Sequence, residues 1–314
     1  MSLEVEQRDL ASSWMAAARA GDFRRAWQIA DRALALRDGA TCWHLPRHEQ
    51  WVWDGRPLDG RRVLVRCYHG LGDTIQYARF LPRVQANVVV WAQAELLPLL
   101  RTLPARLELL PLHEGAPDTD YDVDLEIMEL GHALRIGLES LPGPVPYFRV
   151  PPAPRYTSVF SVGLLAHAGD FMAWRSVPAD LLVSSLMGLP VAVFGLQLGG
   201  LAGTTDISTP DILTLAARLQ GLDLVISADT MLAHLSGALG VPTWTLLPTP
   251  SDWRWMDQRA DSPWYPTMRL FRQPSPGDWP SVVHEVRKTL ADVLATPSGT
   301  HTRLRPPDLR SMAS

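Results

Sequence analysis

The stretch His69-Gly-Leu-Gly-Asp-Thr-Ile-Gln-Tyr-Ala-Arg-Phe-Leu-Pro82 decides how this chain folds. It follows the apolar run Arg62-Val-Leu-Val-Arg-Cys-Tyr68 directly, so the order is a strand, a tight glycine loop and a helix. Ligands bind at the carboxyl ends of the strands in an open α/β sheet. The stretch therefore predicts a strand over 62–68, a helix over 73–84, and the Asp73 carboxylate at the ligand-binding edge.

The residues of this loop suit chemistry, but they also suit a purely structural role. Gly70 and Gly72 let the backbone approach a ligand because no Cβ stands in the way. Asp73 is placed to take a proton from a hydroxyl group. However, Asp73 with Gln76 three residues later also fits a helix capping box, which requires no catalysis. Both interpretations stay open on these residues alone.

A second junction of the same kind is Ser227-Ala-Asp-Thr-Met-Leu-Ala-His234. Thr230 and His234 are four residues apart and share one face of the predicted helix 230–239, whereas the leucines occupy the opposite face. A helix N-terminus with a Thr hydroxyl and an imidazole suits a diphosphate group. The alternatives are that Asp229 caps the helix and that His234 is structural.

Three further side chains are predicted at the same edge of the second sheet. Arg175 follows the first strand of this half, where its guanidinium can pair bidentately with phosphate. Gln197 ends the next strand and can contact a base or a ribose. Trp253 belongs to the cluster Asp252-Trp-Arg-Trp255, which either stacks on a ring or simply packs. A surface role remains the alternative for Arg175 and Gln197.

Composition limits the class of protein. The 314 residues carry a formal net charge of −4, so a basic surface for nucleic acid is not expected. Only two cysteines occur, which excludes a disulfide framework and favours a reducing, cytoplasmic location. The N-terminus lacks the apolar core of a signal peptide, and no run reaches the ~18 apolar residues of a membrane span.

The pattern along the chain predicts four segments. Alternating strands and helices favour two α/β domains, with the proline-rich segment 141–154 as the linker between them. The segment Ala20-Gly-Asp22 separates two predicted helices near the N-terminus, which resemble one tetratricopeptide unit. One unit cannot bury its own apolar face, so we expect the hairpin to pack against the main body, with docking of a partner protein as the alternative. The predicted segments are a helical hairpin at 1–40, domains at 50–150 and 155–294, and a flexible tail at 295–314.

Several common motifs are absent from the sequence. It contains no phosphate-binding P-loop, no Gly-x-Ser-x-Gly elbow and no zinc-binding His-Glu-x-x-His. The loop at 69–74 has Gly-x-Gly but lacks the third glycine of the dinucleotide fingerprint, which disfavours NAD. An NAD-dependent sugar-nucleotide epimerase is therefore only a third hypothesis, which predicts that NAD copurifies with the protein.

Taken together, the motifs resemble glycosyltransferase family nine, the heptosyltransferase family, and in particular its tetratricopeptide-associated bacterial branch. The resemblance rests on Gly70 to Pro82, on Asp223 to Pro242, on Asp252 to Trp255 and on Ser262 to Gln273. These motifs occur in the family's order and the resemblance covers roughly residues 50 to 290. The loop 166–174 departs from the branch in carrying fewer basic groups.

The resemblance implies a GT-B fold, with two Rossmann-like domains that face a cleft. It implies an inverting transfer of a hexosyl or heptosyl group from a nucleoside-diphosphate sugar to an acceptor hydroxyl, without a bound metal or cofactor. The first domain would bind the acceptor, a saccharide, natural product or protein, and the second the donor. Asp73 would be the base, and the acceptor-side loop would comprise His69, Gly70, Gly72 and Gln76. On the donor side, the resemblance assigns Arg175, Thr230 and His234 to the diphosphate and sugar and Asp229 to a sugar hydroxyl. Gln197 and Met231 complete the predicted donor-binding set, and Trp253 is a candidate for stacking on the base or another ring.

A second hypothesis belongs to a different class. A repurposed member of the family would bind a nucleotide sugar or a partner protein without catalysis. The two hypotheses differ in whether replacing Asp73 changes the turnover of a nucleotide sugar.

Overall fold

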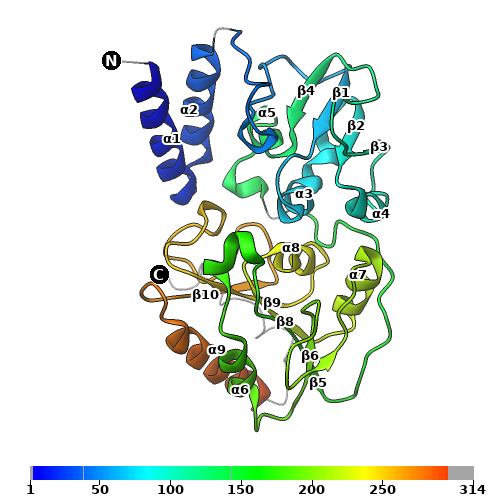
Figure 1. Ribbon diagram of the computed structural model, residues 1–314, viewed down its shortest axis with the longest axis vertical. Coiled ribbons are helices and arrows are strands. Elements are labelled where there is room, and N and C mark those ends of the chain that lie inside the picture. The colour runs from blue at the N-terminus through cyan, green and yellow to red at the C-terminus, as the bar shows by residue number, and fades with distance from the viewer. Residues whose placement is uncertain (1–2, 38, 142, 296–314) are drawn as a thin grey trace. The chain divides into compact units, whose positions relative to one another are not determined.

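The computed structural model describes residues 3–37, 39–141 and 143–295 (Figure 1). The chain divides into two compact units, Met1–Gly143 and Pro144–Ser314. Each unit contains one parallel β-sheet with helices, so the predicted α/β class is confirmed. The predicted flexible tail falls, apart from Ala295, outside the described residues.

The first unit begins with two helices that lie side by side, α1 (Leu3–Arg19) and α2 (Phe23–Leu36) (Figure 1). Gly21 has a φ of +75°, a conformation that glycine adopts without strain and that lets the chain reverse between the helices. The side chain of Asp22 caps α2 by accepting the backbone N–H of Arg25 at 3.0 Å. The hairpin therefore forms where the sequence predicts it.

The helical hairpin packs against the rest of its unit through one face of α2. Trp27 is buried, and its indole N–H donates to the carbonyl of Ile136 at 2.8 Å. Its ring also stacks on His132, with 5.6 Å between ring centroids. Asp31 accepts from His132 at 2.8 Å and pairs with Arg135. One helical pair cannot bury its own apolar face, and these contacts cover that face.

The first sheet has the strand order β3-β2-β1-β4, with every neighbouring pair parallel. Val63 and Val65 of β1 are fully buried, as parallel strands require. The strands are β1 (Arg62–Arg66), β2 (Asn87–Ala92), β3 (Leu107–Pro111) and β4 (Val123–Glu126). The α-helices that follow them are α3 (Leu71–Tyr77), α4 (Leu97–Leu100) and α5 (Leu130–Ala133).

The boundaries of the decisive stretch differ from the prediction. The strand ends at Arg66, and the helix begins at Leu71 rather than at Asp73. After Tyr77 the chain continues as a 3₁₀ helix, Ala78–Arg83, which contains Pro82. Because Pro82 has no backbone N–H to donate, the α-helix does not continue to residue 84.

The second sheet has six parallel strands in the order β10-β9-β8-β5-β6-β7. Counted within this unit the order is 6-5-4-1-2-3, the doubly wound arrangement of a Rossmann fold. The strands are β5 (Phe160–Leu165), β6 (Val191–Gly195), β7 (Thr205–Asp206), β8 (Leu224–Ala228), β9 (Thr243–Leu247) and β10 (Met268–Arg272). The helices are α6 (Ala179–Leu186), α7 (Ile212–Gln220), α8 (Met231–Ala238) and α9 (Trp279–Leu294).

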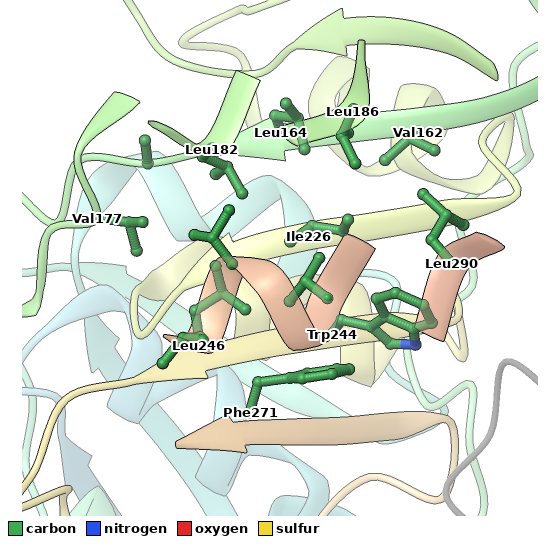
Figure 2. Close-up of a cluster of buried hydrophobic side chains, with 14 of the residues drawn as sticks. Val162, Leu164, Val177, Leu182, Leu186, Ile226, Trp244, Leu246, Phe271 and Leu290 are labelled. Atoms are coloured by element: carbon green, nitrogen blue, oxygen red, sulfur yellow. The ribbon is translucent and has the colours of Figure 1, made fainter. Parts of the chain in front are cut away.

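An apolar core holds α6 and α9 on one face of this sheet (Figure 2). Side chains of β5, β8 and β9 that point to this face, such as Leu164, Ile226 and Trp244, contact leucines and valines of the two helices. The alternate residues of β8 point to the other face, where α8 packs. Both faces of the sheet are therefore covered, as in other purely parallel sheets.

Two strands of this sheet are absent from the sequence prediction. Strand β10 pairs with β9 along its full length, from Met268 beside Thr243 to Arg272 beside Leu247. Its sequence, Met-Arg-Leu-Phe-Arg, mixes charged and apolar residues because β10 is the edge strand. Strand β7 has only two residues, too few to give a periodic signal.

Candidate functional site

The second unit contains a topological switch point between β5 and β8. Strand order reverses there, so the loops that leave the carboxyl ends of these two neighbours diverge and make room for a ligand. The loop after β5 contains the 3₁₀ helix Asp170–Arg175, which ends in Arg175. Asp229 follows β8 directly. The topology thus brings two of the predicted donor-site residues to one point.

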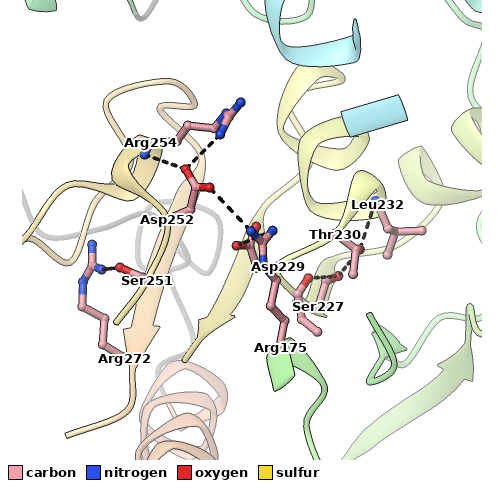
Figure 3. A network of polar contacts seen from close by, with 10 residues as sticks. Arg175, Ser227, Asp229, Thr230, Leu232, Ser251, Asp252, Arg254 and Arg272 are labelled. Atoms are coloured by element: carbon pink, nitrogen blue, oxygen red, sulfur yellow. Dashed lines mark hydrogen bonds and ion pairs between the residues drawn. The ribbon is translucent and has the colours of Figure 1, made fainter. Parts of the chain in front are cut away.

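Arg175 lies between two carboxylates at this switch point (Figure 3). Its Nη1 is 3.2 Å from Asp229 Oδ2, and its Nη2 is 3.5 Å from Asp252 Oδ2. Both distances exceed the ~2.7–2.9 Å of a strong charge-assisted hydrogen bond. The Asp229 contact is an ion pair without hydrogen-bond alignment, and the buried Arg175 Nε–H has no hydrogen-bond partner among the described residues. The guanidinium therefore keeps donor capacity for an anion.

Asp229 is a buried carboxylate, only 3% exposed. Burial raises its pKa above the ordinary value, although the neighbouring Arg175 acts in the opposite direction. The indole of Trp255 also favours the ionised form. The pKa of Asp229 is therefore determined by its buried protein surroundings and not by solvent.

Thr230, not Asp229, caps helix α8. Its backbone is extended, and its Oγ1 accepts the backbone N–H of Leu232 at 3.2 Å. The interpretation of Asp229 as the helix cap is therefore wrong, and its carboxylate is directed to Arg175 instead. Met231 is the first residue of the helix and is partly exposed. Thr230 and Met231 thus form the helix N-terminus beside the Arg175–Asp229 pair.

His234 lies deeper than the helical pattern indicates. Its imidazole is 6% exposed and stacks on Trp255, with 5.3 Å between ring centroids. Its Nδ1 is 2.9 Å from the hydroxyl of Tyr265. Every residue of α8 from Leu232 to Ala238 is buried, so this helix has no polar face. Trp255 and Tyr265 cover the imidazole, so His234 is as buried as the leucines of the helix. The ligand contact of His234 stays a prediction.

Gln197 and Trp253 occupy different surroundings. The Gln197 side-chain oxygen accepts the backbone N–H of His167 at 3.0 Å, which ties the loop after β6 to the loop after β5. Trp253 is 8% exposed, with its ring 6.2 Å from that of Trp264 and the Arg254 guanidinium 4.9 Å from its centroid. Little of the Trp253 ring is therefore open for stacking. Ligand contacts of both residues stay predictions.

In the first unit, Asp73 is the third residue of α3. The backbone N–H of Gly70, which precedes the helix, donates to Asp73 Oδ2 at 3.0 Å. A Cβ on Gly70 would lie 3.3 Å from the same oxygen, so glycine permits this close contact. Asp73 does belong to a capping box, but as its N3 residue, with Gly70 as the N-cap residue. Asp73 is partly exposed at the carboxyl end of β1.

The first sheet also has a switch point, between β1 and β4. His69, in the loop after β1, has its Nδ1 3.0 Å from Oε1 of Glu126, the last residue of β4. Glu126 in turn accepts the N–H of Met128 at 2.7 Å. Both sheets therefore have an acid–base pair across the switch point, His69–Glu126 in one and Arg175–Asp229 in the other.

Glu129 holds two backbone segments of the first unit together near the end of β4. Its Oε2 accepts the backbone N–H of Glu126 at 2.8 Å and that of Trp53 at 3.0 Å. Burial raises the pKa of Glu129 to about 7, despite these two hydrogen bonds.

Of the other predicted loop residues, Gly72 lies in the first turn of α3, and Gln76 has no exposed surface. Gln76 therefore reaches a ligand only if α3 moves.

Sequence reasoning missed the roles of four charged residues. Glu126 is the last residue of β4, so the principle that ligands bind at the carboxyl ends of strands points to it. Asp252 and Arg254 lie in a motif that was noted, but without a role. Glu129 gives no sequence signal, because its hydrogen-bond donor Trp53 comes from a distant part of the chain.

Three further findings concern the part of the chain that the structure describes. In the described ranges, no group of three or more His, Cys, Asp or Glu side chains is arranged to hold a metal ion. Nor does any helix of those ranges have the length and apolar character to cross a membrane. Cys42 and Cys67 are both buried and unpaired with each other.

No family model and no curated protein matches the chain, but solved structures share its fold. The E. coli ADP-heptose lipopolysaccharide heptosyltransferase II superposes with a TM-score of 0.51 at 15% identity, over 73% of this chain and 98% of that one. The iron-containing dodecameric glycosyltransferase TibC from enterotoxigenic E. coli H10407 gives 0.52 at 13% identity, over 82% of this chain and 78% of that one. TibC in complex with ADP-D-beta-D-heptose gives 0.51 at 13%, over 79% and 78%. The chain has the GT-B-like α/β fold of these glycosyltransferases.

Proposed function

We propose that this protein is an inverting glycosyltransferase that uses a nucleoside-diphosphate sugar as donor. One observation carries the proposal: the buried Nε–H of Arg175 has no acceptor among the described residues, and it lies at the switch point where such folds bind ligands. Buried donors in native proteins almost always have partners. A phosphate oxygen would complete the hydrogen bonding of this guanidinium.

The donor would bind to the second unit. Arg175 and the N-terminus of α8, at Thr230 and Met231, would face the diphosphate, since both present positive or N–H character to an anion. These groups would stabilise the negative charge that develops as the nucleoside diphosphate departs. Asp229 would accept a hydrogen bond from a sugar hydroxyl. Heptosyltransferases and TibC share this fold, and the TibC complex contains ADP-heptose, which supports a hexosyl or heptosyl donor.

The acceptor would bind to the first unit, with Asp73 as the base. Its carboxylate would take the proton of an acceptor hydroxyl while the oxygen attacks the anomeric carbon of the sugar. The bond from that carbon to the diphosphate oxygen would break on the opposite side, which inverts the configuration. The Gly70 N–H that holds Asp73 Oδ2 would fix the direction of the carboxylate. The His69–Glu126 pair would line the acceptor site beside this loop.

Donor turnover tests this proposal. The purified protein is incubated with a panel of nucleotide sugars, with water or simple glycosides as acceptors, and release of nucleoside diphosphate is measured. We expect turnover of at least one donor, and a loss of about 10²- to 10⁴-fold in kcat for Asp73→Asn. Asp118→Asn is the control, since that side chain is 87% exposed.

Two outcomes would contradict the proposal in different ways. Equal turnover by the wild type and Asp73→Asn would show that Asp73 is not the base. Donor binding without any turnover would favour a binding protein that has lost catalysis.

A further inference from the structure

The loop after β9 brings a second carboxylate, Asp252, to the switch point. Its two oxygens contact different guanidinium groups: Oδ2 is 3.5 Å from Arg175 Nη2, and Oδ1 is 3.0 Å from Arg254 Nη1 (Figure 3). The side chain is 18% exposed. Although burial opposes ionisation, the Arg254 guanidinium and backbone N–H outweigh it and lower the pKa of Asp252. Asp252 is thus a charged bridge between two loops.

The loop that contains Asp252 is anchored on several sides. Its carboxylate accepts the backbone N–H of Arg254 at 3.0 Å, and the Arg254 carbonyl accepts the indole N–H of Trp264 at 2.7 Å. From β10, Arg272 donates to Ser251 Oγ at 2.7 Å and to the carbonyl of Trp255 at 2.6 Å. These bonds fix the position of the Asp252 carboxylate relative to the second sheet.

Arg175 is held less firmly by its own surroundings. It ends a short 3₁₀ helix and its guanidinium lies 5.1 Å from the ring of Trp174, which is 53% exposed. Its contact with Asp229 lacks hydrogen-bond alignment. A long arginine side chain loses rotamer entropy when it is ordered, so a fixed partner is needed to keep one orientation. Asp252 is the partner that comes from an anchored loop.

We propose that Asp252 is a positioning residue for Arg175, which directs the unpartnered Nε–H edge of the guanidinium toward a phosphate group at the switch point. This role rests on the proposed donor function of Arg175. Asp252 itself contacts no ligand in this proposal. It acts by fixing the Arg175 guanidinium that would hold the diphosphate.

The direction of the effect separates positioning from simple electrostatics. Asp252 is an anion close to a site for another anion. If it were a bystander, its removal would strengthen the binding of an anion, because a repulsive charge would be lost. If Asp252 positions Arg175, its removal weakens the binding of the anion, since the Arg175 guanidinium is no longer held toward the anion site.

The test measures the affinity for inorganic pyrophosphate by isothermal titration calorimetry, because this probe carries the diphosphate without base or sugar. In Asp252→Asn the amide oxygen still accepts the Arg254 N–H, while the Arg175 contact is lost. We expect binding about tenfold weaker than in the wild type. Asp252→Ser, which also retains a capping oxygen, should behave alike. Asp170→Asn removes a fully exposed charge from the Arg175 loop and should stay within about twofold.

A double-mutant cycle with Arg175→Ala completes the test. If Asp252 acts through Arg175, then Asp252→Asn has no further effect on pyrophosphate affinity in the Arg175→Ala background. Unchanged or tighter binding by Asp252→Asn, or an equal loss in both backgrounds, would overturn the positioning role and leave the donor site intact. If the wild type binds neither pyrophosphate nor any of a panel of nucleoside diphosphates, the donor-site proposal is wrong and the positioning role falls with it.

Discussion

Arg175 Nη1 lies 3.2 Å from Asp229 Oδ2 and joins the loops that leave β5 and β8 in different directions. The two residues are 54 positions apart in sequence, and only the strand order 6-5-4-1-2-3 makes them neighbours. The pair marks the point of the second sheet where a Rossmann-type fold binds a ligand.

Replacing Arg175 should weaken the binding of nucleoside diphosphates. A hydrogen bond to a charged group contributes about 1.5–3 kcal/mol, so Arg175→Ala should raise the Kd about 10- to 150-fold. Arg175→Lys keeps the charge but loses the planar fork, and should fall between the wild type and the alanine variant. Calorimetric titration checks this order, and an Arg175→Lys variant weaker than Arg175→Ala would contradict it.

The capping role of Asp73 can be tested separately from its proposed role as the base. Asp73→Asn keeps an oxygen that accepts the Gly70 N–H, so its free energy of unfolding should stay within about 0.5 kcal/mol of the wild type. Asp73→Ala removes the acceptor and should cost about 0.5–2 kcal/mol. Urea denaturation gives both values. Equal stability of the two variants would mean that the Gly70 contact contributes nothing.

Glu129 should make stability depend on pH. Its pKa in the folded protein is raised from an ordinary 4.5 to about 7, chiefly by burial. The neutral carboxyl therefore stabilises the fold fully below pH 4.5, and this contribution is lost as the pH rises through 7. Glu129→Gln keeps the oxygen that accepts both N–H groups and does not ionise, so it should gain about 3 kcal/mol over the wild type between pH 4.5 and pH 8.

The measurement for Glu129 is the free energy of unfolding in urea at several pH values. Glu114→Gln is the control, because the Glu114 side chain is fully exposed and should not change the pH dependence. Parallel curves for Glu129→Gln and the wild type would show that the carboxyl of Glu129 titrates normally.

The helical hairpin should contribute to the stability of the first unit. Trp27 is buried and donates to Ile136, so Trp27→Ala should lower the free energy of unfolding by about 3–5 kcal/mol. Met15→Ala, on the same hairpin but at a side chain that is 39% exposed, should cost less than about 0.5 kcal/mol. Denaturation by urea compares them, and similar small losses would mean that the hairpin is not packed on the unit.

The sequence predicted the features that depend on local patterns. The apolar run before the glycine loop and the Ser-Ala-Asp-Thr junction gave β1, β8 and the residues that follow them. Because strand ends gather at one edge, Arg175 and Asp229 could be expected at the same edge of one sheet without any contact being known. The α/β class followed from the alternation of strands and helices.

The features that were missed depend on tertiary contacts. Helix α8 was expected to show a polar face, but Tyr265 and Trp255 cover His234, and a Cβ on Gly237 would lie 2.5 Å from the Tyr265 ring. Asp252 was seen only as part of an aromatic motif, because its partner Arg175 is 77 residues away. The domain limits, the tetratricopeptide likeness of the hairpin and its docking of a partner stay predictions.

The most direct test of the central claim is a thermal-shift measurement of the wild type and Arg175→Ala with a panel of nucleoside diphosphates and nucleotide sugars. A ligand that binds the folded state raises Tm by mass action. We predict that at least one nucleotide sugar and its nucleoside diphosphate raise the Tm of the wild type, and that Arg175→Ala loses most of this shift. If no nucleotide raises the Tm of the wild type, or if Arg175→Ala shows the same shift, the second unit does not bind a donor through Arg175.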